Sequence, residues 1–423
     1  FPLMFPAPKV NGYVVPGGWM PWRQLRLGCH PQDLYDELKA LPGFNAKELA
    51  MDPALEAKAI EGCQQDEYEE WIELHIRREQ HWFEILQHLM KKDHCDLVGV
   101  LFDGVDKIQH LCLRFLYPRF FRSNPDEWEL RVRELCVDYF RQLDGILRKI
   151  NDLSGPDANV AIASDHGFGP SAEVFHINTW LEQNGYLAWA DPESMNPEDS
   201  ETLGMGSIAK HVYELDWART TAYVATPSSN GVYIVPGETG NGDEGAPREA
   251  RRFRNRLMSR LRNFTDESTG QAIVSRIWSK DQVFDGPFKD LAPDLTLELR
   301  DGGLVSILPS ESPLSLRADV TGAHRSQGVF MAKGPGVREG DAVSELSIMD
   351  VTPLLVYWMG LPIPEDFEGR LPEEIFESPV QADTEQPGVR PASPGPQSRR
   401  EVSLSEEDEA IMVERLKALG YIE

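Results

Sequence analysis

Three short segments of the chain carry residue types that bind divalent metal ions. In the first, LFDGVDKIQH, Asp106 and His110 are four residues apart, so a helix that begins just after Phe102 would place both side chains on one face. A carboxylate oxygen and an imidazole nitrogen are ligands that zinc-like ions accept. A single pair of this kind is more often a surface contact than a metal site. Asp103, in the same segment, fits a capping or supporting role better than that of a third ligand.

The second segment is ASDHGFGP, in which Asp165 and His166 directly follow the apolar run 159–163. Open α/β sheets form their ligand crevices at the carboxyl ends of strands, so both side chains can face one crevice. We expect Gly167 and Gly169 to allow unusual backbone angles and the close approach of a ligand. Taken alone, SDHG also fits an Asx-turn with a solvent-facing histidine.

The third segment is TGAHRSQGVFMAKGPG, where we expect His324 to lie in a Gly-flanked turn just before a strand at 328–332. A lone histidine in such a turn is usually a surface residue. The combination is more informative, because the three segments flank predicted strands and together supply two carboxylates and three imidazoles. The remaining histidines do not join these three segments and are expected to be solvent or packing residues. They are His30, His75, His81, His88, His94, His176 and His211.

Six short apolar runs rich in Val, Ile or Leu are predicted to be strands, since buried parallel strands have this composition. They are 96–103, 159–164, 220–225, 231–235, 293–299 and 328–332. Between the first two, the segment 125–150 repeats apolar residues at helical spacing, which indicates a strand–helix–strand unit. The sequence therefore predicts an α/β protein with a mostly parallel sheet between helices.

Other segments with helical periodicity or helix-capping residues are 71–90, 177–184, 247–261 and 351–359. The region 24–90 is helical and acidic and has no strand signal, so we expect a helical cap over the sheet at about residues 24–95. The segments 190–206 and 236–247 are predicted loops because Gly, Pro, Glu and Asp cluster there. Residues 1–378 are thus expected to form one α/β domain.

The C-terminal part of the sequence has a different composition. Residues 379–400 contain five prolines and no apolar periodicity, which is typical of a linker. In the last segment, 401–423, a helix is predicted at 405–419, where Ser405 and Asp408 form a capping box. We expect this helix to dock on the body of the protein or on a second subunit, which would allow a homo-oligomer.

The formal net charge of −27 argues against a nucleic-acid backbone or an anionic membrane surface as partner, because both are polyanions. A small anionic substrate is still possible, since salt screens distant charges. The five cysteines are widely spaced and form no CxxC pair, as expected for reduced thiols. Without an apolar run long enough to span a membrane or a signal sequence, the expected location is the cytoplasm.

The ordered set DxxxH, SDHG and GxH ahead of GVFMAKGPG resembles the alkaline phosphatase superfamily, and most closely its type I phosphodiesterase/nucleotide pyrophosphatase branch. The similarity also covers the segments 10–22, 292–299, 348–370 and 415–423. This resemblance implies a parallel-rich sheet between helices and two divalent metal ions, zinc or manganese, at the strand ends. It also implies a small phosphoester or nucleotide as the substrate.

Carried over residue by residue, the resemblance makes Asp106, His110 and His324 the ligands of one ion and Asp165 and His166 ligands of the other. These five residues would stabilise charge and would not shuttle protons. In the family, a further aspartate and the nucleophilic Thr or Ser precede the segment that VNGYVVPGG resembles. Because the sequence begins at Phe1, shortly before that segment, we expect a fragment whose nucleophile lies upstream, and no residue is assigned that role.

Three hypotheses about function follow from these observations. The first is a two-metal phosphodiesterase or nucleotide pyrophosphatase of which this chain carries most of the site. The second is a non-catalytic protein that retains a metal site for structure or ligand binding. The third is a phosphomutase or sulfatase, although a sulfatase with one metal ion would not need the Asp106/His110 pair.

Overall fold

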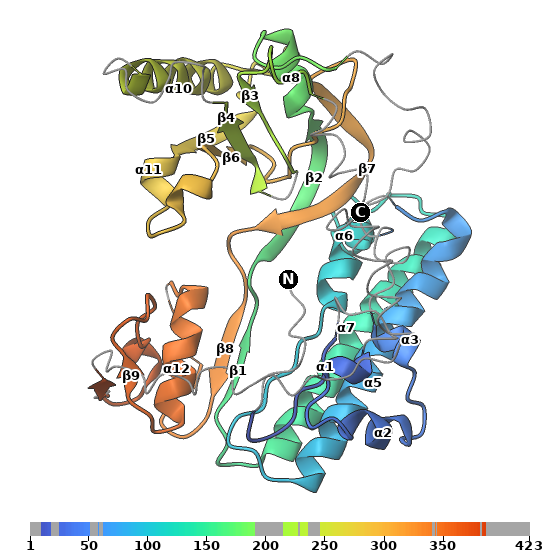
Figure 1. The fold of residues 1–423 in the computed structure, drawn as a ribbon. Helices are drawn as coiled ribbons and strands as arrows, with labels where there is room; N and C mark the ends of the chain where they lie inside the picture. The colour runs from blue at the N-terminus through green and yellow to red at the C-terminus, as the bar shows by residue number, and fades with distance from the viewer. Residues whose placement is uncertain are drawn as a thin grey trace, which may run out of the picture. The chain divides into compact units, whose positions relative to one another are not determined.

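The computed structural model describes most of the chain in two compact units (Figure 1). The first unit comprises Phe1–Ala158 and Ser164–Val329, and the second comprises Asn159–Ala163 and Phe330–Glu423. The described residues are 10–17, 25–50, 58, 62–190, 215–226, 229–235, 246–340, 343, 345–380 and 383–385.

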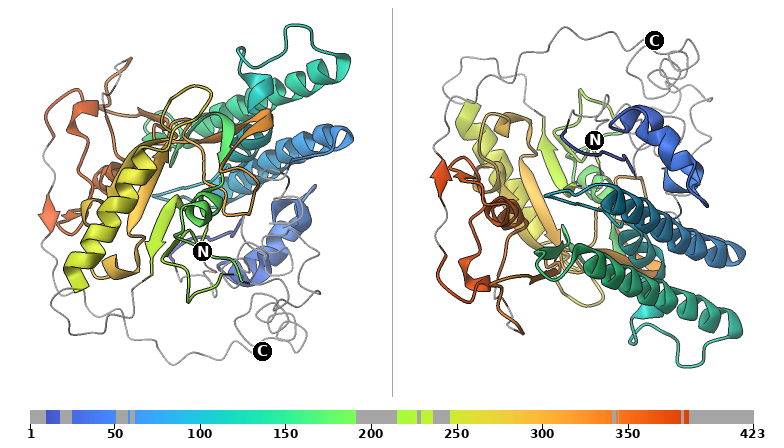
Figure 2. Two further views of the ribbon diagram at one scale, coloured as in Figure 1. Left: turned by 90° about the horizontal axis from the view of Figure 1, so that it is seen from above. Right: turned by 90° about the horizontal axis from the view of Figure 1, so that it is seen from below.

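The N-terminal half of the first unit is helical. Its helices are α1 (Leu25–Gly28), α2 (Leu34–Lys39), α3 (Ala46–Leu49), the 3-10 turn η2 (Gln65–Glu67), α5 (Tyr68–Lys92), α6 (Gly104–Leu116) and α7 (Glu127–Ser154). The long helices α5 and α7 lie side by side (Figure 2). Helix α7 begins at a capping box in which Asp126 and Glu129 each accept a backbone hydrogen bond from the other. The helices predicted at 71–90 and 125–150 are confirmed.

Helix α6 is held by a core that it shares with α5 and α7. Ile108 and Phe115 of α6 are fully buried against Ile72 of α5 and Val132 of α7. Burial of such side chains stabilises a fold by roughly 1.5–3 kcal/mol each. Because this packing fixes the orientation of α6, it also fixes the direction of the opposite face, which carries Asp106.

A long antiparallel ribbon connects the helical half of the unit to its sheet. It consists of β2 (Gly167–Phe175) and β7 (Leu314–Arg325). In its register, Gly167 pairs with Arg325 and Phe168 pairs with His324. Helix α6 packs against both strands, and Asp106 of α6 lies close to His166 before β2 and to His324 near the end of β7.

The rest of the first unit is a four-stranded sheet in the order β3–β4–β6–β5, with every neighbouring pair antiparallel. Its elements are β3 (Ala222–Tyr223), β4 (Gly231–Ile234), β5 (Val274–Ser279), β6 (Leu295–Leu299), α8 (Ile177–Gln183), α10 (Ala246–Arg262), α11 (Lys280–Val283) and η7 (Lys289–Leu291). Leu257 and Leu261 of α10 are fully buried in the same core as Leu295 of β6. The core thereby anchors α10 to the sheet.

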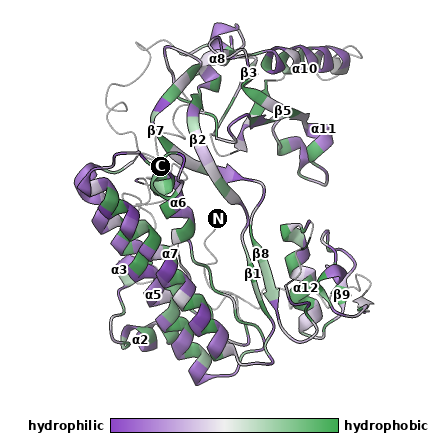
Figure 3. Ribbon diagram, turned by 180° about the vertical axis from the view of Figure 1, so that it is seen from behind, coloured by the Kyte–Doolittle hydropathy of each residue, from purple (hydrophilic) through white to green (hydrophobic). Residues whose placement is uncertain are grey.

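The second unit contains a two-stranded antiparallel pair and a small helical part. The elements are β1 (Val160–Ala163), β8 (Phe330–Lys333), η8 (Ile348–Asp350), α12 (Val351–Trp358), β9 (Ile363–Pro364), η9 (Glu373–Ile375) and β10 (Thr384–Glu385). Strand β1 is hydrophobic along its length (Figure 3). Leu354, Ile375 and Phe376 form the buried core of this unit.

The mixed α/β class is confirmed, but a mostly parallel sheet is not. Among the described strand pairs, only β9–β10 is parallel. The strand predicted at 96–103 is wrong, because this segment forms no strand in the structure. A strand needs a neighbour to accept its backbone hydrogen bonds, and the described residues provide none here. Leu97 and Leu101 are consequently 53% and 77% exposed.

The remaining strand and helix predictions differ mainly in length. The strands predicted at 159–164, 231–235, 293–299 and 328–332 correspond to β1, β4, β6 and β8, and that at 220–225 is reduced to the two residues of β3. The predicted helices at 177–184, 247–261 and 351–359 correspond to α8, α10 and α12. The predicted loops at 190–206 and 236–247 lie almost entirely outside the described residues.

Of the predicted linker, the structure describes only 379–380 and 383–385, which include β10, and the predicted C-terminal helix lies outside the described residues. All five cysteines are free, as expected from their spacing. Among the helices that the structure describes, none combines the length and apolar character needed to cross a membrane.

Candidate metal centre

Helix α6 presents the first two candidate ligands. Asp106 and His110 lie on successive turns, and the Asp106 Oδ1 and His110 Nε2 atoms are 3.5 Å apart. The helix expected after Phe102 is confirmed, beginning at Gly104. The capping role expected of Asp103 is not confirmed, because its side chain makes no capping hydrogen bond to the helix.

The ribbon of β2 and β7 supplies two further imidazoles. His166 immediately precedes β2, and His324 is the second-last residue of β7. The expectation that His324 lies in a turn is therefore wrong. Its place in a long strand follows from the pairing of β7 with β2, which extends the strand through the TGAHR segment.

Four of the five predicted ligands come together at this point of the first unit. Asp106 Oδ1 lies 3.2 Å from His324 Nε2 and 3.6 Å from His166 Nε2. His110 Nε2 lies 2.9 Å from His324 Nε2. The rings of His166 and His324 are stacked with 3.6 Å between their centroids. One carboxylate and three imidazoles thus converge from α6, the start of β2 and the end of β7.

The donor distances are close to those around a bound divalent cation, with two of them slightly shorter. Nitrogen and oxygen ligands about 2.0–2.2 Å from a tetrahedral zinc ion are themselves separated by roughly 3.3–3.6 Å. The three distances among Asp106 Oδ1, His110 Nε2 and His324 Nε2 are 3.5, 2.9 and 3.2 Å. The potential ligand atoms of Asp106, His166 and His324 also all lie within 4.8 Å of one another. This donor set can accept an ion with only small side-chain shifts.

Backbone carbonyl groups orient two of the imidazoles. His110 Nδ1 lies 3.1 Å from the Gly322 carbonyl oxygen, and His166 Nδ1 lies 3.2 Å from the Gly167 carbonyl oxygen. A carbonyl oxygen only accepts hydrogen bonds, so each Nδ1 is assigned the proton. The Nε2 lone pair of each ring then faces the cluster, as metal-binding histidines require.

The electrostatics favour the protonation states that a metal ion needs. Burial lowers the pKa of His110, an effect that the charge of Asp106 only partly offsets. Burial is also the largest single effect on Asp106 and raises its pKa, but the His324 hydrogen bond and the charges of His110 and Lys107 together bring the pKa below its usual value. Near neutral pH the site therefore offers an ionised carboxylate and a neutral His110.

Asp165 does not join the four clustered side chains. Its carboxylate is 81% exposed, and its Oδ1 accepts a hydrogen bond from the His166 backbone N–H at 3.0 Å. The same Oδ1 lies 3.5 Å from His166 Nε2. Asp165 is therefore a largely exposed carboxylate beside His166.

The glycines of the SDHG segment have a steric role. Gly167 and Gly169 are strand residues of β2, without the positive φ angle that would require glycine, so the expected unusual backbone angles are wrong. A Cβ on Gly167 would instead lie 1.9 Å from the Gln327 carbonyl oxygen, and one on Gly169 would lie 2.5 Å from Arg325 Nε. Glycine here allows neighbouring parts of the protein to approach the backbone of β2.

Residues that sequence reasoning missed also shape the site. Phe168 contacts three of the imidazoles, and Glu79 of α5 accepts a hydrogen bond from the Gly104 backbone N–H at the start of α6. Phe168 lies inside the SDHGF segment at strand spacing from His166, a signal that the sequence contained. Nothing near Glu79 in the sequence points to α6.

The fold and the site together define a mixed α/β protein with an Asp/His cluster of the kind that binds divalent cations. The model of the type I phosphodiesterase / nucleotide pyrophosphatase family matches residues 7–326. The chain belongs to this family. No curated protein matches the sequence.

Solved structures with partial similarity include two of phosphonoacetate hydrolase from Sinorhizobium meliloti 1021. The complex with phosphonoformate shares 13% identity and a TM-score of 0.35, covering 68% of this chain and 57% of that chain. The complex with phosphonoacetate shares 14% identity and a TM-score of 0.38, covering 81% of this chain and 70% of that chain. In the first of these alignments, the present chain spans little more than half of the hydrolase.

Proposed function

We propose that this chain provides the metal-binding part of a phosphoester hydrolase of the phosphodiesterase or nucleotide pyrophosphatase type. The observation that carries the proposal is the convergence of Asp106, His110, His166 and His324 in a member of this family. An ionised carboxylate beside His110 and His166, whose Nε2 lone pairs face the cluster, is suited to hold a divalent cation.

The proposed ligands divide into two sets. Asp106, His110 and His324 would hold one ion, which is supported by the short distances among their donor atoms. Asp165 and His166 would contribute to a second ion, which is supported by the 3.5 Å between Asp165 Oδ1 and His166 Nε2. Mixed Asp/His donors accept zinc and manganese, so these are the ions to test first.

When bound, two divalent ions would supply the positive charge that neutralises the attacking and leaving oxygens of a phosphoester. The residues of this chain would hold and orient those charges and would not transfer protons themselves. The proposed substrate is a small phosphoester or nucleotide. No nucleophile is assigned to any residue in the described part of the chain.

Metal analysis after dialysis, followed by zinc and manganese titration, tests the proposal directly. We expect at least one bound ion in the purified protein and its loss in His324→Ala. His94→Ala is a matched control, because His94 is exposed and outside the cluster. A folded protein with no bound ion and no response to chelators would refute the metal site. The hydrolase proposal is tested by metal-dependent cleavage of a bis-aryl phosphate by the protein, and hydrolysis that survives His324→Ala would contradict it.

A further inference from the structure

One aromatic ring, that of Phe168, contacts all three imidazoles of the cluster. The ring centroid lies 4.9 Å from His110, 5.4 Å from His166 and 5.1 Å from His324. The interplanar angles are 85°, 61° and 77°, so each contact is edge-to-face. Aromatic pairs favour this geometry at centroid separations of roughly 4.5–7 Å. The described part of the chain therefore holds its three clustered imidazoles around one apolar ring.

The secondary structure explains this position. Side chains two residues apart along an extended chain point to the same side, so Phe168 shares the face of His166. The β2–β7 register pairs Phe168 directly with His324, and such cross-strand pairs have side chains in contact. Helix α6 packs on the same strands and brings His110 to the ring. Phe168 thus contacts histidines from three separate parts of the chain.

The neighbouring backbone leaves little space around the ring. A Cβ on Gly322 would lie 3.0 Å from Phe168 Cδ1, so the strand opposite can come this close only because residue 322 has no side chain. The carbonyl oxygen of this glycine also accepts the hydrogen bond from His110 Nδ1. The Phe168 ring therefore limits where the His110 imidazole can move, and the Gly322 carbonyl group limits how that imidazole rotates.

A phenylalanine side chain cannot ligate a metal ion or transfer a proton, so its effect must be exerted through its neighbours. An imidazole that is free to change rotamer loses that freedom when it binds an ion, and this lowers affinity. A rigid apolar neighbour removes the freedom beforehand, which is the role of supporting residues in preorganised sites.

We propose that Phe168 is a positioning residue that fixes His110, His166 and His324 with their Nε2 atoms facing the metal position. This inference rests on the proposed metal site. A positioning role differs from ordinary core packing in one measurable way. A ring that only packs affects the stability of the metal-free protein, whereas a positioning ring affects metal affinity beyond any effect on that stability.

The experiment measures zinc affinity by competition with a chromophoric chelator in wild type, Phe168→Ala, Phe168→Leu and Phe168→Tyr. Leu keeps most of the apolar volume and is the variant to use if Ala fails to fold, whereas Tyr keeps the ring. Phe253→Ala is the matched control, because Phe253 is a half-buried phenylalanine that packs against Tyr186 in a different core. Unfolding of each protein in excess chelator reports metal-free stability, and the visible spectrum of the cobalt-substituted protein reports ligand geometry.

We expect Phe168→Ala to weaken zinc binding by at least about tenfold and to change the cobalt spectrum. Phe168→Leu should weaken zinc binding less. Phe168→Tyr and Phe253→Ala should bind zinc as wild type does. Wild-type affinity and an unchanged spectrum in Phe168→Ala would overturn the positioning role while leaving the metal site intact. Equal weakening by Phe253→Ala would also overturn it. A wild-type protein that binds no ion would instead refute the metal site and this inference with it.

Discussion

The Gly322 carbonyl oxygen and His110 Nδ1 are 3.1 Å apart, a hydrogen bond that connects β7 to α6. The approach of these two elements depends on the absence of a side chain at Gly322. A Cβ at this position would lie 2.1 Å from the Gln109 carbonyl oxygen, far closer than two such atoms can come. The orientation of His110 and the packing of α6 on β7 therefore depend on the same glycine.

We predict that Gly322→Ala separates α6 from β7 and weakens both the fold and the metal site. The added methyl group meets backbone atoms that cannot move away alone, so the free energy of unfolding should fall by about 1–3 kcal/mol. Zinc affinity should fall as well, because Asp106 and His110 move away from His324.

Gly145→Ala in α7 is the matched control. It has open space around its Cβ and should raise stability by about 0.5–1 kcal/mol. Similar effects of the two substitutions would contradict this steric account.

The start of α6 is held by a buried carboxyl group on another helix. Glu79 Oε1 accepts hydrogen bonds from the Gly104 backbone N–H and the Tyr139 hydroxyl, each at 2.9 Å. Glu79 and Tyr139 are almost fully buried. Glu79→Ala should leave both donors buried without this acceptor and lower the free energy of unfolding by about 2–4 kcal/mol. Glu79→Gln keeps an acceptor oxygen and should cost much less. Chemical denaturation of both variants tests this account. If Glu79 contributed only its volume, Glu79→Ala would cost no more than the cavity that it leaves.

The same carboxyl group should make stability depend on pH. Burial raises the pKa of Glu79 from its usual 4.5 to about 8, and the charge of Asp103 acts in the same direction. Between these values the folded protein retains a proton that the unfolded chain releases. The contribution of Glu79 to stability is therefore fully present below pH 4.5 and is lost as the pH rises to about 8. Within this window the slope is about 1.4 kcal/mol per pH unit.

Unfolding free energies measured between pH 5 and 9 in the presence of a chelator test this linkage. We expect the decline of stability with pH to be absent from Glu79→Gln, since a glutamine has no proton to lose. The chelator removes any pH dependence that arises from metal binding. A decline of the same slope in wild type and Glu79→Gln would show that another group is responsible.

The parts of the fold that the sequence predicts well are those with strong periodicity. Helices α5 and α7 each bury one stripe of apolar residues, and the 3.6-residue period is visible in both sequences. The ribbon of β2 and β7 is different, since GFGPSAEVF and LSLRADVTGAHR show no steady alternation. Its strands exist because they pair with each other, and the pairing partner is more than a hundred residues away in the sequence.

The site illustrates the same limit. The order of the DxxxH, SDHG and GxH motifs predicts the candidate ligands, and the structure brings Asp106, His110, His166 and His324 together. The sequence could not show that His324 lies in a strand opposite Phe168, because this depends on the β2–β7 register. It also could not show that Glu79 reaches Gly104, since that contact depends on how α5 packs against α6. In contrast, 96–103 has the composition of a strand without a described neighbour to pair with.

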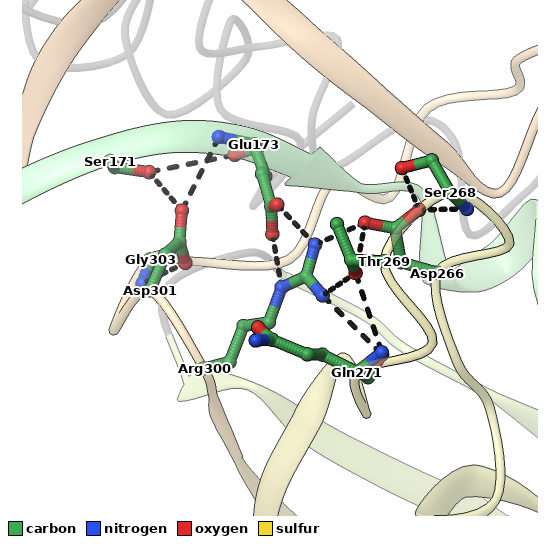
Figure 4. Close-up of polar contacts among 9 residues, drawn as sticks. All are labelled: Ser171, Glu173, Asp266, Ser268, Thr269, Gln271, Arg300, Asp301 and Gly303. Atoms are coloured by element: carbon green, nitrogen blue, oxygen red, sulfur yellow. Dashed lines mark hydrogen bonds and ion pairs between the residues drawn. The ribbon is translucent and has the colours of Figure 1, made fainter.

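A network of charged residues ties β2 to the sheet at the far end of the ribbon (Figure 4). Arg300, which follows β6, donates to both carboxylate oxygens of Glu173 and to Asp266 Oδ2. The Ser171 hydroxyl donates to Asp301 at 2.9 Å and extends the network. All three members of the Arg300 cluster are largely shielded from water, with side chains 14–18% exposed.

We predict that Arg300→Ala destabilises the first unit far more than the loss of a surface ion pair does. The Arg300 guanidinium is the largest cause of the lowered pKa of Asp266, and without it Glu173 and Asp266 would both remain as shielded carboxylates without their common cation. The matched control is Arg148→Ala, because Arg148 pairs with Asp144 in α7 and both side chains are more than 70% exposed. Such exposed pairs contribute little.

Thermal unfolding of these two variants gives the first comparison, and a double-mutant cycle of Arg300→Ala with Glu173→Ala isolates the coupling between the pair. We expect a clear drop in the unfolding midpoint for Arg300→Ala and almost none for Arg148→Ala. Glu173→Ala should partly rescue Arg300→Ala, because it removes one of the two carboxylates left without a cation.

In acid the cost of Arg300→Ala should shrink. The stability contributed by Asp266 is lost as the pH falls below 3.8, the usual pKa of an aspartate, and towards the lower pKa of Asp266 in the folded protein. Additive effects in the cycle, with no dependence on acid, would show that Arg300 contributes by packing its aliphatic stem and not by its charge.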